Sequence, residues 1–268
     1  MSAGKSLLSA APVALVTGGA SGLGRAVALR LARSGCRGVV ALDLAEPAAA
    51  DAPPAAAAGA ARVLGVKGDV AFEPDVVRAL DACAREFGSA PRIVVSCAGI
   101  APSVRLLGKR GVHALDVFER TLRVNVVGTF NVMRLAADRM KDLPVLDDVD
   151  RQRGVVVNTA SVAAFDGQIG QVAYSASKGA VTGMCLPAAR DLSSLGIRVA
   201  TVAPGVFKTP MVAGLPEEAQ RSLAAAVPFP ARLGDPDEFA KLVLHVCDNA
   251  MLNGEVVRLD GALRMAPR

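Results

Sequence analysis

The sequence contains very few aromatic side chains and only one tyrosine. Aromatic residues make up 3% of its 268 residues, and the single tyrosine is Tyr174. A chain so poor in aromatics does not scatter phenol groups over its surface, so Tyr174 is a candidate for chemistry. The apolar runs are also far shorter than the roughly 18 to 20 residues that cross a bilayer. No transmembrane helix is therefore expected.

Neither a dense basic block nor a metal-ligand pattern is present. The 30 basic and 25 acidic residues give a net charge of +5. Arg105, Lys109 and Arg110 lie close together, but no K/R-rich run is found, so nucleic-acid binding is not indicated. His113 and His245 lie far apart, and no two cysteines have the spacing of metal ligands. The sequence therefore predicts no metal site.

The cysteines and the first residues indicate a compartment. The cysteines are odd in number, widely spaced and set in apolar surroundings, which is typical of reduced, buried thiols. Residues 1–11 contain no long apolar stretch, so no secretory signal is expected, although their Ser-rich, acid-poor composition also suits an organellar presequence. We predict an N-terminal arm over 1–11 and a location in the cytoplasm or the mitochondrial matrix. The five cysteines are Cys36, Cys83, Cys97, Cys185 and Cys247.

Small apolar residues are abundant and occur in an alternating order. Hydrophobic residues make up 52% of the chain and the mean hydropathy is +0.39. Short apolar runs alternate with longer helical patterns, which indicates a parallel sheet buried on both faces. We predict an α/β fold, a single Rossmann-type doubly wound domain over 12–268 with about seven parallel strands and helices on both faces. The runs are 12–16, 38–42, 62–67, 92–96, 154–160, 197–202 and 255–259, and the helical patterns include 25–33, 74–87, 115–141 and 236–247.

A glycine-rich turn follows the first predicted strand. The stretch T-G-G-A-S-G-L-G includes Gly18, Ser21, Gly22, Leu23 and Gly24, and a helical pattern comes directly after it. Glycines let the backbone turn tightly and approach a pyrophosphate, and the helix N-terminus offers unpaired N–H groups to it. Strand, glycine turn, helix, strand and acid in this order predict a dinucleotide-binding unit.

The acid that completes this unit is Asp43, nineteen residues after Gly24. A carboxylate at the tip of the second strand can accept hydrogen bonds from both hydroxyls of an adenosine ribose, and it repels the 2′-phosphate of NADP. Neither the glycine turn nor the residues just after Asp43 supply the arginine that an NADP site needs. The predicted cofactor is therefore NAD.

Further strand ends carry candidate cofactor contacts. Asp69 and Val70 follow the third strand, and Asp69 is equally well read as an adenine contact or as a turn acid. The small residues at Cys97, Ala98 and Gly99 would let a cofactor lie across the fourth strand end. Two stretches are predicted as substrate loops. One is 101–112, which has no clear periodicity. The other is a mobile flap over 205–232, which follows the rigid turn in A-P-G-V-F-K-T-P, a stretch that includes Pro204, Gly205, Phe207 and Thr209.

The catalytic candidates lie between Ser161 and Lys178. Tyr174 and Lys178 are four residues apart, so on a helix they share a face and the ammonium can stabilise an ionised phenol. Ser161 follows an apolar run, where its hydroxyl could polarise a substrate oxygen. Asn125 is an amide among valines and must find partners; structural bonding and a proton path both remain open.

These motifs together resemble the classical short-chain dehydrogenase/reductase family. The resemblance rests on T-G-G-A-S-G-L-G, Asp43, Asp69-Val70, C-A-G, Asn125, Ser161, Y-S-A-S-K and P-G-V-F-K-T-P, and it covers essentially the whole chain. Further stretches, including A-S-V-A-A-F-D-G-Q-I-G-Q and L-N-G-E-V-V-R-L-D-G-A-L-R-M, resemble the type-2 3-hydroxyacyl-CoA dehydrogenases within it, also known as multifunctional 17β-hydroxysteroid dehydrogenases.

This resemblance implies an activity and residue roles. The activity would be the NAD-dependent, reversible oxidation of L-3-hydroxyacyl-CoA to 3-ketoacyl-CoA by a homotetramer. Tyr174 would be the general base, Lys178 would lower the pKa of that phenol and hold the nicotinamide ribose, and Ser161 would position the substrate oxygen. Asn125 would support a water relay, and Gln168 would contact the substrate. The NAD site would be lined by Ser21, Leu23, Asp43, Asp69, Val70, Cys97, Phe207 and Thr209.

Two other functions are compatible with the same resemblance. One is a dehydrogenase of hydroxysteroids or other secondary alcohols, which uses the same site. The other belongs to a different class, a scaffold subunit of a tRNA-processing complex. The intact Ser161, Tyr174 and Lys178 argue against a purely structural role. Lys208 differs from the small residue that the resembling group carries there, and the divergent 101–112 loop leaves the acyl-chain preference open.

Overall fold

A seven-stranded parallel sheet forms the centre of the molecule, as the alternating apolar runs predict. The computed structural model describes residues 4–45, 61–109 and 111–267, so nearly all of an Ala/Pro-rich stretch at 45–61, expected to be a surface connection, lies outside the described residues. The strands lie side by side in the order β3-β2-β1-β4-β7-β8-β9. Their bounds are β1 (Val13–Thr17), β2 (Gly38–Asp43), β3 (Arg62–Lys67), β4 (Ile93–Ser96), β7 (Gly154–Thr159), β8 (Ile197–Pro204) and β9 (Val256–Leu259).

The order of the strands determines where a ligand can bind. From β1 the chain winds outward through β2 and β3, and it then returns to place β4 on the other side of β1. A sheet wound in two directions from its middle leaves a crevice outside the carboxyl ends of the central strands. The carboxyl ends of β1, β4 and β7 are therefore where the predicted site residues should meet.

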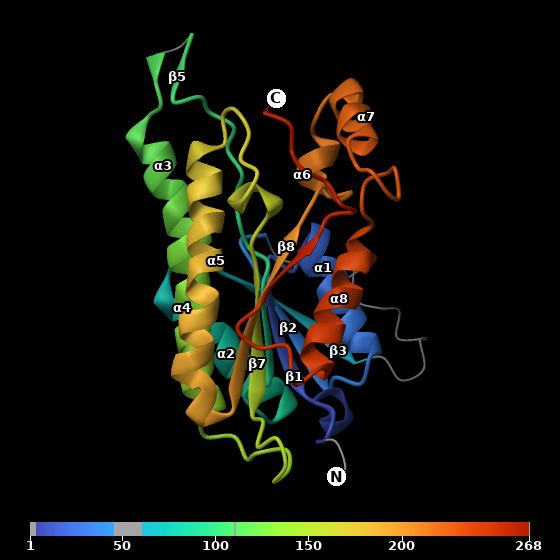
Figure 1. The fold of residues 1–268 in the computed structure, drawn as a ribbon. Coiled ribbons are helices and arrows are strands. Elements are labelled where there is room, and N and C mark those ends of the chain that lie inside the picture. The colour runs from blue at the N-terminus through green and yellow to red at the C-terminus, as the bar shows by residue number, and fades with distance from the viewer. Residues whose placement is uncertain (1–3, 46–60, 110, 268) are drawn as a thin grey trace.

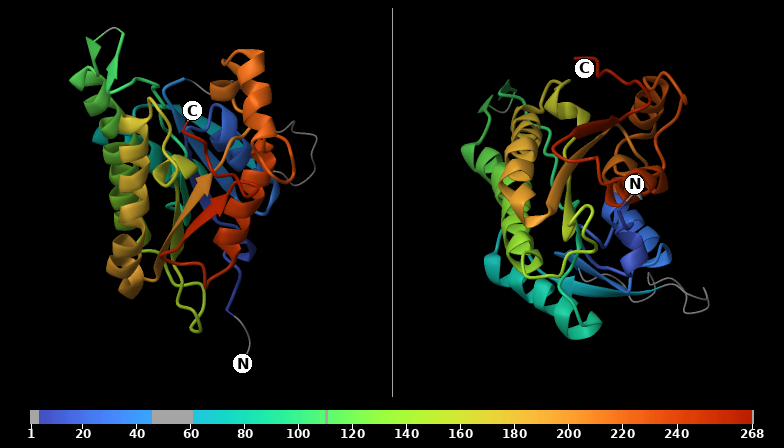
Figure 2. Two further views of the ribbon diagram at one scale, coloured as in Figure 1. Left: turned by 45° about the horizontal axis from the view of Figure 1, so that its top comes forward. Right: turned by 60° about the horizontal axis from the view of Figure 1, so that its bottom comes forward.

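Helices cover both faces of the sheet (Figures 1 and 2). Helices α1 and α8 lie on one face, and α2, α4 and α5 lie on the other. The helix bounds are α1 (Gly22–Arg33), α2 (Glu73–Phe87), α3 (Leu115–Leu122), α4 (Gly128–Met140), α5 (Val172–Leu192), α6 (Pro210–Ala213), α7 (Glu217–Ala225) and α8 (Pro236–Asp248), with single turns η1 (Leu8–Ala10), η3 (Arg123–Val127), η4 (Val162–Ala164) and η5 (Ser193–Leu195).

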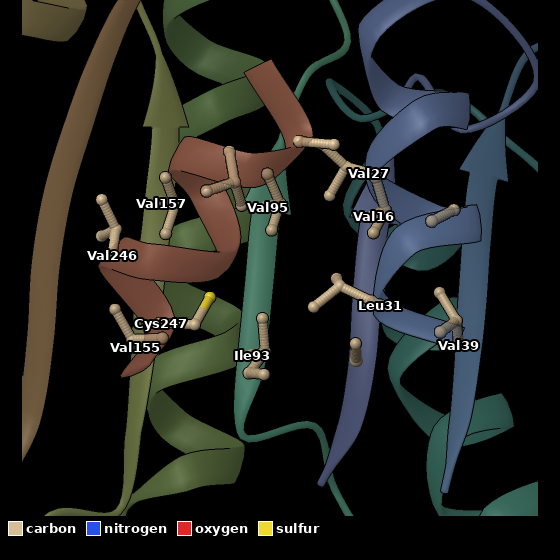
Figure 3. Packing of buried hydrophobic residues seen from close by; sticks show 14 of the residues in the cluster. Val16, Val27, Leu31, Val39, Ile93, Val95, Val155, Val157, Val246 and Cys247 are labelled. Atoms are coloured by element: carbon tan, nitrogen blue, oxygen red, sulfur yellow. The ribbon is translucent and has the colours of Figure 1, made fainter. Parts of the chain in front are cut away.

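The core consists of two apolar layers, one on each face of the sheet. Alternate side chains of a strand point to opposite faces, so neighbouring residues of β1 divide between the layers: Val16 packs against α1 and α8, and Leu15 packs against α2 and α4. Figure 3 shows the first layer, in which Leu31 of α1 and Val246 of α8 meet strand valines. Burial of apolar surface on both faces stabilises the sheet that carries the site.

The structure differs from the sequence prediction in two segments near the carboxyl edge. The helix predicted over 115–141 is divided into α3 and α4 by η3, a π-helical turn. The stretch 101–112, expected to be a loop, contains a two-stranded hairpin of β5 (Leu107–Gly108) and β6 (Gly111–Val112). Gly111 has φ +102°, a conformation that suits glycine in a tight turn. Two residues per strand give no periodicity that a sequence reading could detect.

Within the described residues, no helix is both long enough and apolar enough to span a bilayer. The same part of the chain holds no group of three or more His, Cys, Asp or Glu side chains placed to bind a metal ion.

Arg198 joins the amino end of β8 to the end of α8. Its side chain is buried, and its Nη1 and Nη2 atoms donate to the carbonyl oxygens of Val246 (2.9 Å), Leu252 (2.8 Å) and Cys247 (2.8 Å). Burial lowers the pKa of the guanidinium, since desolvation disfavours the charged form. A planar group with five donors satisfies three carbonyls that no apolar side chain could satisfy.

We expect Arg198→Met to lower the free energy of unfolding by about 3 kcal/mol, because it leaves buried carbonyl groups without a donor. Arg198→Lys should lose less, since one ammonium retains part of this bonding. Urea unfolding followed by circular dichroism measures both. The effect should be confined to stability, because Arg198 lies at the amino end of β8, away from the carboxyl ends where the predicted site residues should meet. A loss below about 0.5 kcal/mol, the usual range for surface substitutions, would contradict this account.

Candidate active site

A cleft of about 960 Å³ lies at the carboxyl ends of the strands. Its walls come from the ends of the central strands, the segment before α5, and the α6–α7 region that Figure 1 shows above the sheet. All but one of the residues predicted from sequence line it; Asn125 is the exception. The lining set includes Gly18, Ser21, Gly22, Leu23, Gly24, Asp43, Asp69, Val70, Cys97, Ala98, Gly99, Ser161, Gln168, Tyr174, Lys178, Pro204, Gly205, Phe207 and Thr209.

Two positions of the glycine turn between β1 and α1 have no room for a side chain. Gly18 has φ +67°, and a Cβ there would lie 2.8 Å from the backbone nitrogen of Ala98. A Cβ on Gly24 would lie 2.2 Å from the carbonyl oxygen of Gly18. These contacts bring the start of α1 against the strand ends, where its free N–H groups can bind an anion. The turn fits a pyrophosphate.

Asp43 is fixed at the end of β2 with its carboxylate at the cleft wall. One oxygen accepts from the backbone N–H of Ala20 (3.0 Å), and the other accepts from that of Ala45 (3.2 Å). Each carboxylate oxygen has a second lone pair, so the group can still accept hydrogen bonds from a diol. The glycine turn therefore holds the acid in place through Ala20, a link that sequence spacing alone did not show.

Asp69 performs the structural role that the sequence left open. Its carboxylate accepts from the backbone N–H of Ala71 (2.8 Å), and its own N–H donates to Asp75 (2.8 Å). The turn-acid interpretation is therefore confirmed. The residue also lines the cleft next to Val70, so an adenine contact stays a prediction that these bonds do not oppose.

The serine and the tyrosine reach the cleft from neighbouring elements. Ser161 follows β7 and caps η4, where its Oγ accepts from the backbone N–H of Ala163 (3.1 Å). Tyr174 lies in the first turn of α5. Burial raises the pKa of Tyr174 above its ordinary value of 10.0, and the nearby Ser161 hydroxyl opposes this rise. Both residues line the cleft.

Lys178 is the buried cation of the site. Its Nζ donates to the carbonyl oxygen of Thr159 (2.8 Å) and lies 5.8 Å from the centre of the Tyr174 ring. Burial lowers the pKa of Lys178 to about 8. The net shift of the Tyr174 pKa is upward because burial is its largest cause, and the sequence-based expectation that Lys178 lowers this pKa is not met.

The lowered pKa of Lys178 has a consequence for stability. The unfolded chain binds its proton up to about pH 10.5 and the folded chain only up to about pH 8, so this group makes folding more favourable as the pH rises between those values. Relative to Lys178→Met, the wild type should gain about 1 kcal/mol of unfolding free energy from pH 7.5 to pH 9. Urea unfolding of both proteins at the two pH values measures this gain. Equal pH dependence in the two proteins would rule out a titrating Lys178.

Asn125 lies behind the cleft, in the π-helical turn η3. Its Oδ1 accepts from the N–H of Ile100 (2.8 Å), and its Nδ2 donates to the Ile100 carbonyl (2.8 Å) and to Ser177 Oγ (2.9 Å). The structural-bonding alternative from the sequence is therefore confirmed. This amide ties the segment after β4 to the second turn of α5, one residue from Lys178, so it holds the two walls of the site together.

Two residues predicted to line the cofactor site also contact other side chains of the protein. Cys97 accepts from Thr159 Oγ1 at 3.5 Å, and burial raises the pKa of its thiol to about 11, so it is a small neutral residue at the strand end. Phe207 is buried against Phe239 of α8 in an edge-to-face contact, with 6.3 Å between ring centres. Phe207 therefore anchors the beginning of the stretch that was expected to be mobile.

The structure adds lining residues that the sequence analysis missed. Some lie in the predicted loops, where no periodicity singles out individual positions. Others are neighbours of residues that the sequence analysis did identify: Gln171 lies between Ser161 and Lys178, and Val124 precedes Asn125. Met265 ends the stretch L-N-G-E-V-V-R-L-D-G-A-L-R-M, but nothing in that pattern indicates that it reaches this edge of the sheet. The added residues include Ser103, Arg120, Arg123, Val124, Gln171, Met211, Leu215, Leu223 and Met265.

Comparison with known proteins agrees over almost the whole chain. A family model described as short chain dehydrogenase matches residues 12–220. The 3-hydroxyacyl-CoA dehydrogenase type-2 of Drosophila melanogaster is 52% identical over 263 residues, 95% of this chain and 98% of that protein. The Homo sapiens protein of that name is 50% identical, covering 95% and 96%. The crystal structure of 3-hydroxyacyl-CoA dehydrogenase type-2 from Mycobacterium avium superposes with a TM-score of 0.85 at 38% identity, covering 98% of this chain and 99% of that one.

Proposed function

Because this chain belongs to the short-chain dehydrogenase family, we propose that it catalyses the NAD-dependent, reversible oxidation of L-3-hydroxyacyl-CoA to 3-ketoacyl-CoA. The observation that carries the substrate class is the identity of about 50% to proteins named 3-hydroxyacyl-CoA dehydrogenase type-2, over nearly the full length of both chains. The family implies a nicotinamide cofactor, and the glycine turn and Asp43 fit one.

The proposed chemistry begins with a proton transfer. In the oxidation direction, the Tyr174 phenolate takes the proton of the substrate's 3-hydroxyl group, and Ser161 donates a hydrogen bond that positions the same oxygen. NAD supplies the acceptor for the hydride that leaves the carbinol carbon. In the reverse direction, the phenol returns its proton to the oxygen. One proton and one hydride leave the alcohol in each oxidation, so the reaction balances.

Lys178 is proposed to stabilise the ionised form of the Tyr174 phenol during the reaction. An ammonium about 6 Å from the phenol ring in a buried site stabilises negative charge there, because little water screens it. The carbonyl of Thr159 holds the ammonium, and Gly99 leaves the space beside it open: a Cβ on Gly99 would lie 3.6 Å from Nζ. The same ammonium has two further donors, which could hold the hydroxyls of a nicotinamide ribose.

Asp43 supports NAD over NADP. Its carboxylate stands at the cleft wall, where the second strand of a dinucleotide-binding unit meets the ribose, and a 2′-phosphate there would face a negative charge. Asp43 accepts hydrogen bonds from two backbone N–H groups and, among the described residues, forms no ion pair that would neutralise its charge.

We also propose a homotetramer located in the cytoplasm or mitochondrial matrix. Large apolar side chains remain half exposed on the α4 and α5 side of the molecule, among them Phe130 and Leu186. Apolar surface of this kind on helices is typical of subunit contacts. Light scattering coupled to size-exclusion chromatography tests this assembly, and a monomeric mass at micromolar concentration would contradict it.

The deciding experiment follows nicotinamide absorbance with acetoacetyl-CoA as the oxidised substrate. We expect oxidation of NADH with clear preference over NADPH. A panel of acyl-CoAs and hydroxysteroids in the same assay separates the two enzyme classes by kcat/KM. Failure to turn over any acyl-CoA, or a higher kcat/KM for a steroid, would overturn the proposed substrate class. A role limited to scaffolding would leave every substrate untouched.

A further inference from the structure

The segment before α5, residues 165–171, carries Gln168 into the cleft but has little structure of its own. We call it the bridging segment, because it joins η4 to α5. Its internal bonds all join Gln168 and Gln171: Gln171 N–H to the Gln168 carbonyl (3.0 Å), Gln168 N–H to Gln171 Oε1 (3.1 Å), and Gln171 Nε2 to Gln168 Oε1 (3.4 Å). Phe165 and Ile169 are about half exposed, so apolar burial does not hold the segment in place. Its position must depend on contacts from elsewhere in the chain.

Arg258 of β9 supplies the strongest of these contacts. Its Nη2 donates to Asp166 Oδ2 at 2.6 Å and its Nη1 lies 3.4 Å from Oδ1, so the ion pair is bidentate. The guanidinium also lies over the Phe165 ring, 5.3 Å from its centre, and its Nε donates to Asp260 (2.8 Å). The Arg258 and Asp166 side chains are 21% and 18% exposed, which is sheltered enough for the pair to exceed a surface ion pair in strength.

Backbone contacts add to this ion pair: the Val104 N–H donates to the Gly170 carbonyl (2.9 Å), and the chain end supplies further bonds. Arg258 Nη2 donates to the carbonyl of Leu263, where the C-terminal tail, residues 263–267, begins. The tail then bonds the bridging segment twice: Gln168 Nε2 donates to the Ala266 carbonyl (2.9 Å), and the Ile169 N–H donates to the Pro267 carbonyl (3.0 Å). Figures 1 and 2 show the red tail beside the yellow segment that precedes α5. Met265 of this tail lines the cleft.

We infer that Arg258 is a positioning residue. Through its contacts with Asp166 and the C-terminal tail, it determines the positions of Gln168 and Met265 at the substrate end of the cleft. Arg258 and Asp166 do not line the cleft, so they act through the residues that do. The contacts of Arg258 join three separate parts of the chain, namely β9, the tail and the bridging segment. Loss of the guanidinium would free the wall that faces the substrate while leaving the cofactor residues on β1, β2 and β4 in place.

The fold offers a matched control. Arg30 of α1 forms a bidentate ion pair with Asp237 of α8: its Nε donates to Oδ1 (2.8 Å) and its Nη2 donates to Oδ2 (2.7 Å). The two side chains are 27% and 48% exposed. Neither residue lines the cleft. Arg30→Met therefore removes a comparable ion pair from a helix–helix contact without touching the bridging segment.

The kinetic test compares Arg258→Met with Arg30→Met in the full-length enzyme. We expect Arg258→Met to raise the KM for acetoacetyl-CoA by about tenfold to a hundredfold, the range found when a group that orients a binding residue is lost. The Kd for NADH, measured by fluorescence titration, should stay within about twofold. Arg30→Met should leave both values unchanged, and Arg258→Lys should give a KM between wild type and Arg258→Met. An equal rise in KM for both methionine variants would overturn the inference.

The inference rests on the proposed function for the identity of the ligand at this end of the cleft. A second measurement is therefore chosen that needs no substrate. Hydrogen exchange of the unliganded protein should show amides of residues 165–171 exchanging about tenfold faster in Arg258→Met and in Asp166→Asn, and unchanged in Arg30→Met. The double variant Arg258→Met with Asp166→Asn should exchange no faster than either single one. Unchanged exchange in the bridging segment overturns the positioning role, whereas wild type inert toward acetoacetyl-CoA overturns only the proposed substrate.

Discussion

Replacing Tyr174 by phenylalanine should lower kcat/KM by about a thousandfold or more, while NADH binding stays within about twofold of wild type. The ring and its packing remain, and only the hydroxyl that exchanges a proton with the substrate is lost. General acid–base catalysis by one positioned group contributes about 10² to 10⁴ in rate. Because Tyr174 is the only tyrosine in the chain, no neighbouring phenol can replace it. Steady-state kinetics with acetoacetyl-CoA and a fluorescence titration with NADH measure the two quantities.

Ser175→Ala is the matched control for this variant. Ser175 is the next residue on α5, and its Oγ is buried without a hydrogen-bond partner in the described part of the chain, so the variant removes a nearby hydroxyl that does no proposed chemistry. We expect its kcat/KM within about threefold of wild type, in keeping with the small effect of removing a hydroxyl that bonds nothing. A Tyr174→Phe enzyme with more than a tenth of wild-type activity would exclude the phenol as the acid and base.

Replacing Asp43 by serine should change which cofactor the enzyme uses. Loss of charge-assisted hydrogen bonds to the ribose should lower kcat/KM for NADH by about tenfold to a hundredfold. The repulsion of a 2′-phosphate disappears with the carboxylate, so NADPH should be used relatively better, and the NADH-to-NADPH ratio of kcat/KM should fall by about two to three orders of magnitude. Parallel assays with the two reduced cofactors at fixed acetoacetyl-CoA give this ratio.

Asp69→Asn tests whether the effect belongs to Asp43 in particular. Both acids line the cleft, but Asp69 lies at the end of β3 and its carboxylate bonds the backbone of Ala71. The amide can keep that bond, and we expect the cofactor ratio to stay within about twofold of wild type. If the ratio in Asp43→Ser does not move, the ribose assignment of Asp43 is wrong.

Local spacing in the sequence was enough for the features that depend on neighbouring residues. The order of apolar runs and helical patterns predicted the parallel sheet, because strand and helix periods are local properties. The glycines at 18 and 24 indicated a close turn, and the contacts that a Cβ would meet there show why. Tyr174 and Lys178 could be placed on one helix face by counting four residues.

Long-range contacts were beyond such a reading. The Asn125 amide bonds Ile100 and Ser177, 25 and 52 residues away along the chain, so the sequence left its role open. The upward shift of the Tyr174 pKa also comes from burial by distant elements, whereas the sequence indicated only its neighbouring lysine. The short hairpin at 107–112 has too few residues per strand to show a period.

The sequence by itself determined the fold class, the family and the chemical groups of the site, because these depend on periodicity and on residue types at fixed spacings. Only the tertiary structure decided how the substrate end of the cleft is built. The pairing of Arg258 with Asp166 spans 92 residues, and the bond from Gln168 to Ala266 spans 98. No local pattern encodes either contact, since both arise only when the parallel sheet places β9 two strands away from β7, with β8 between them.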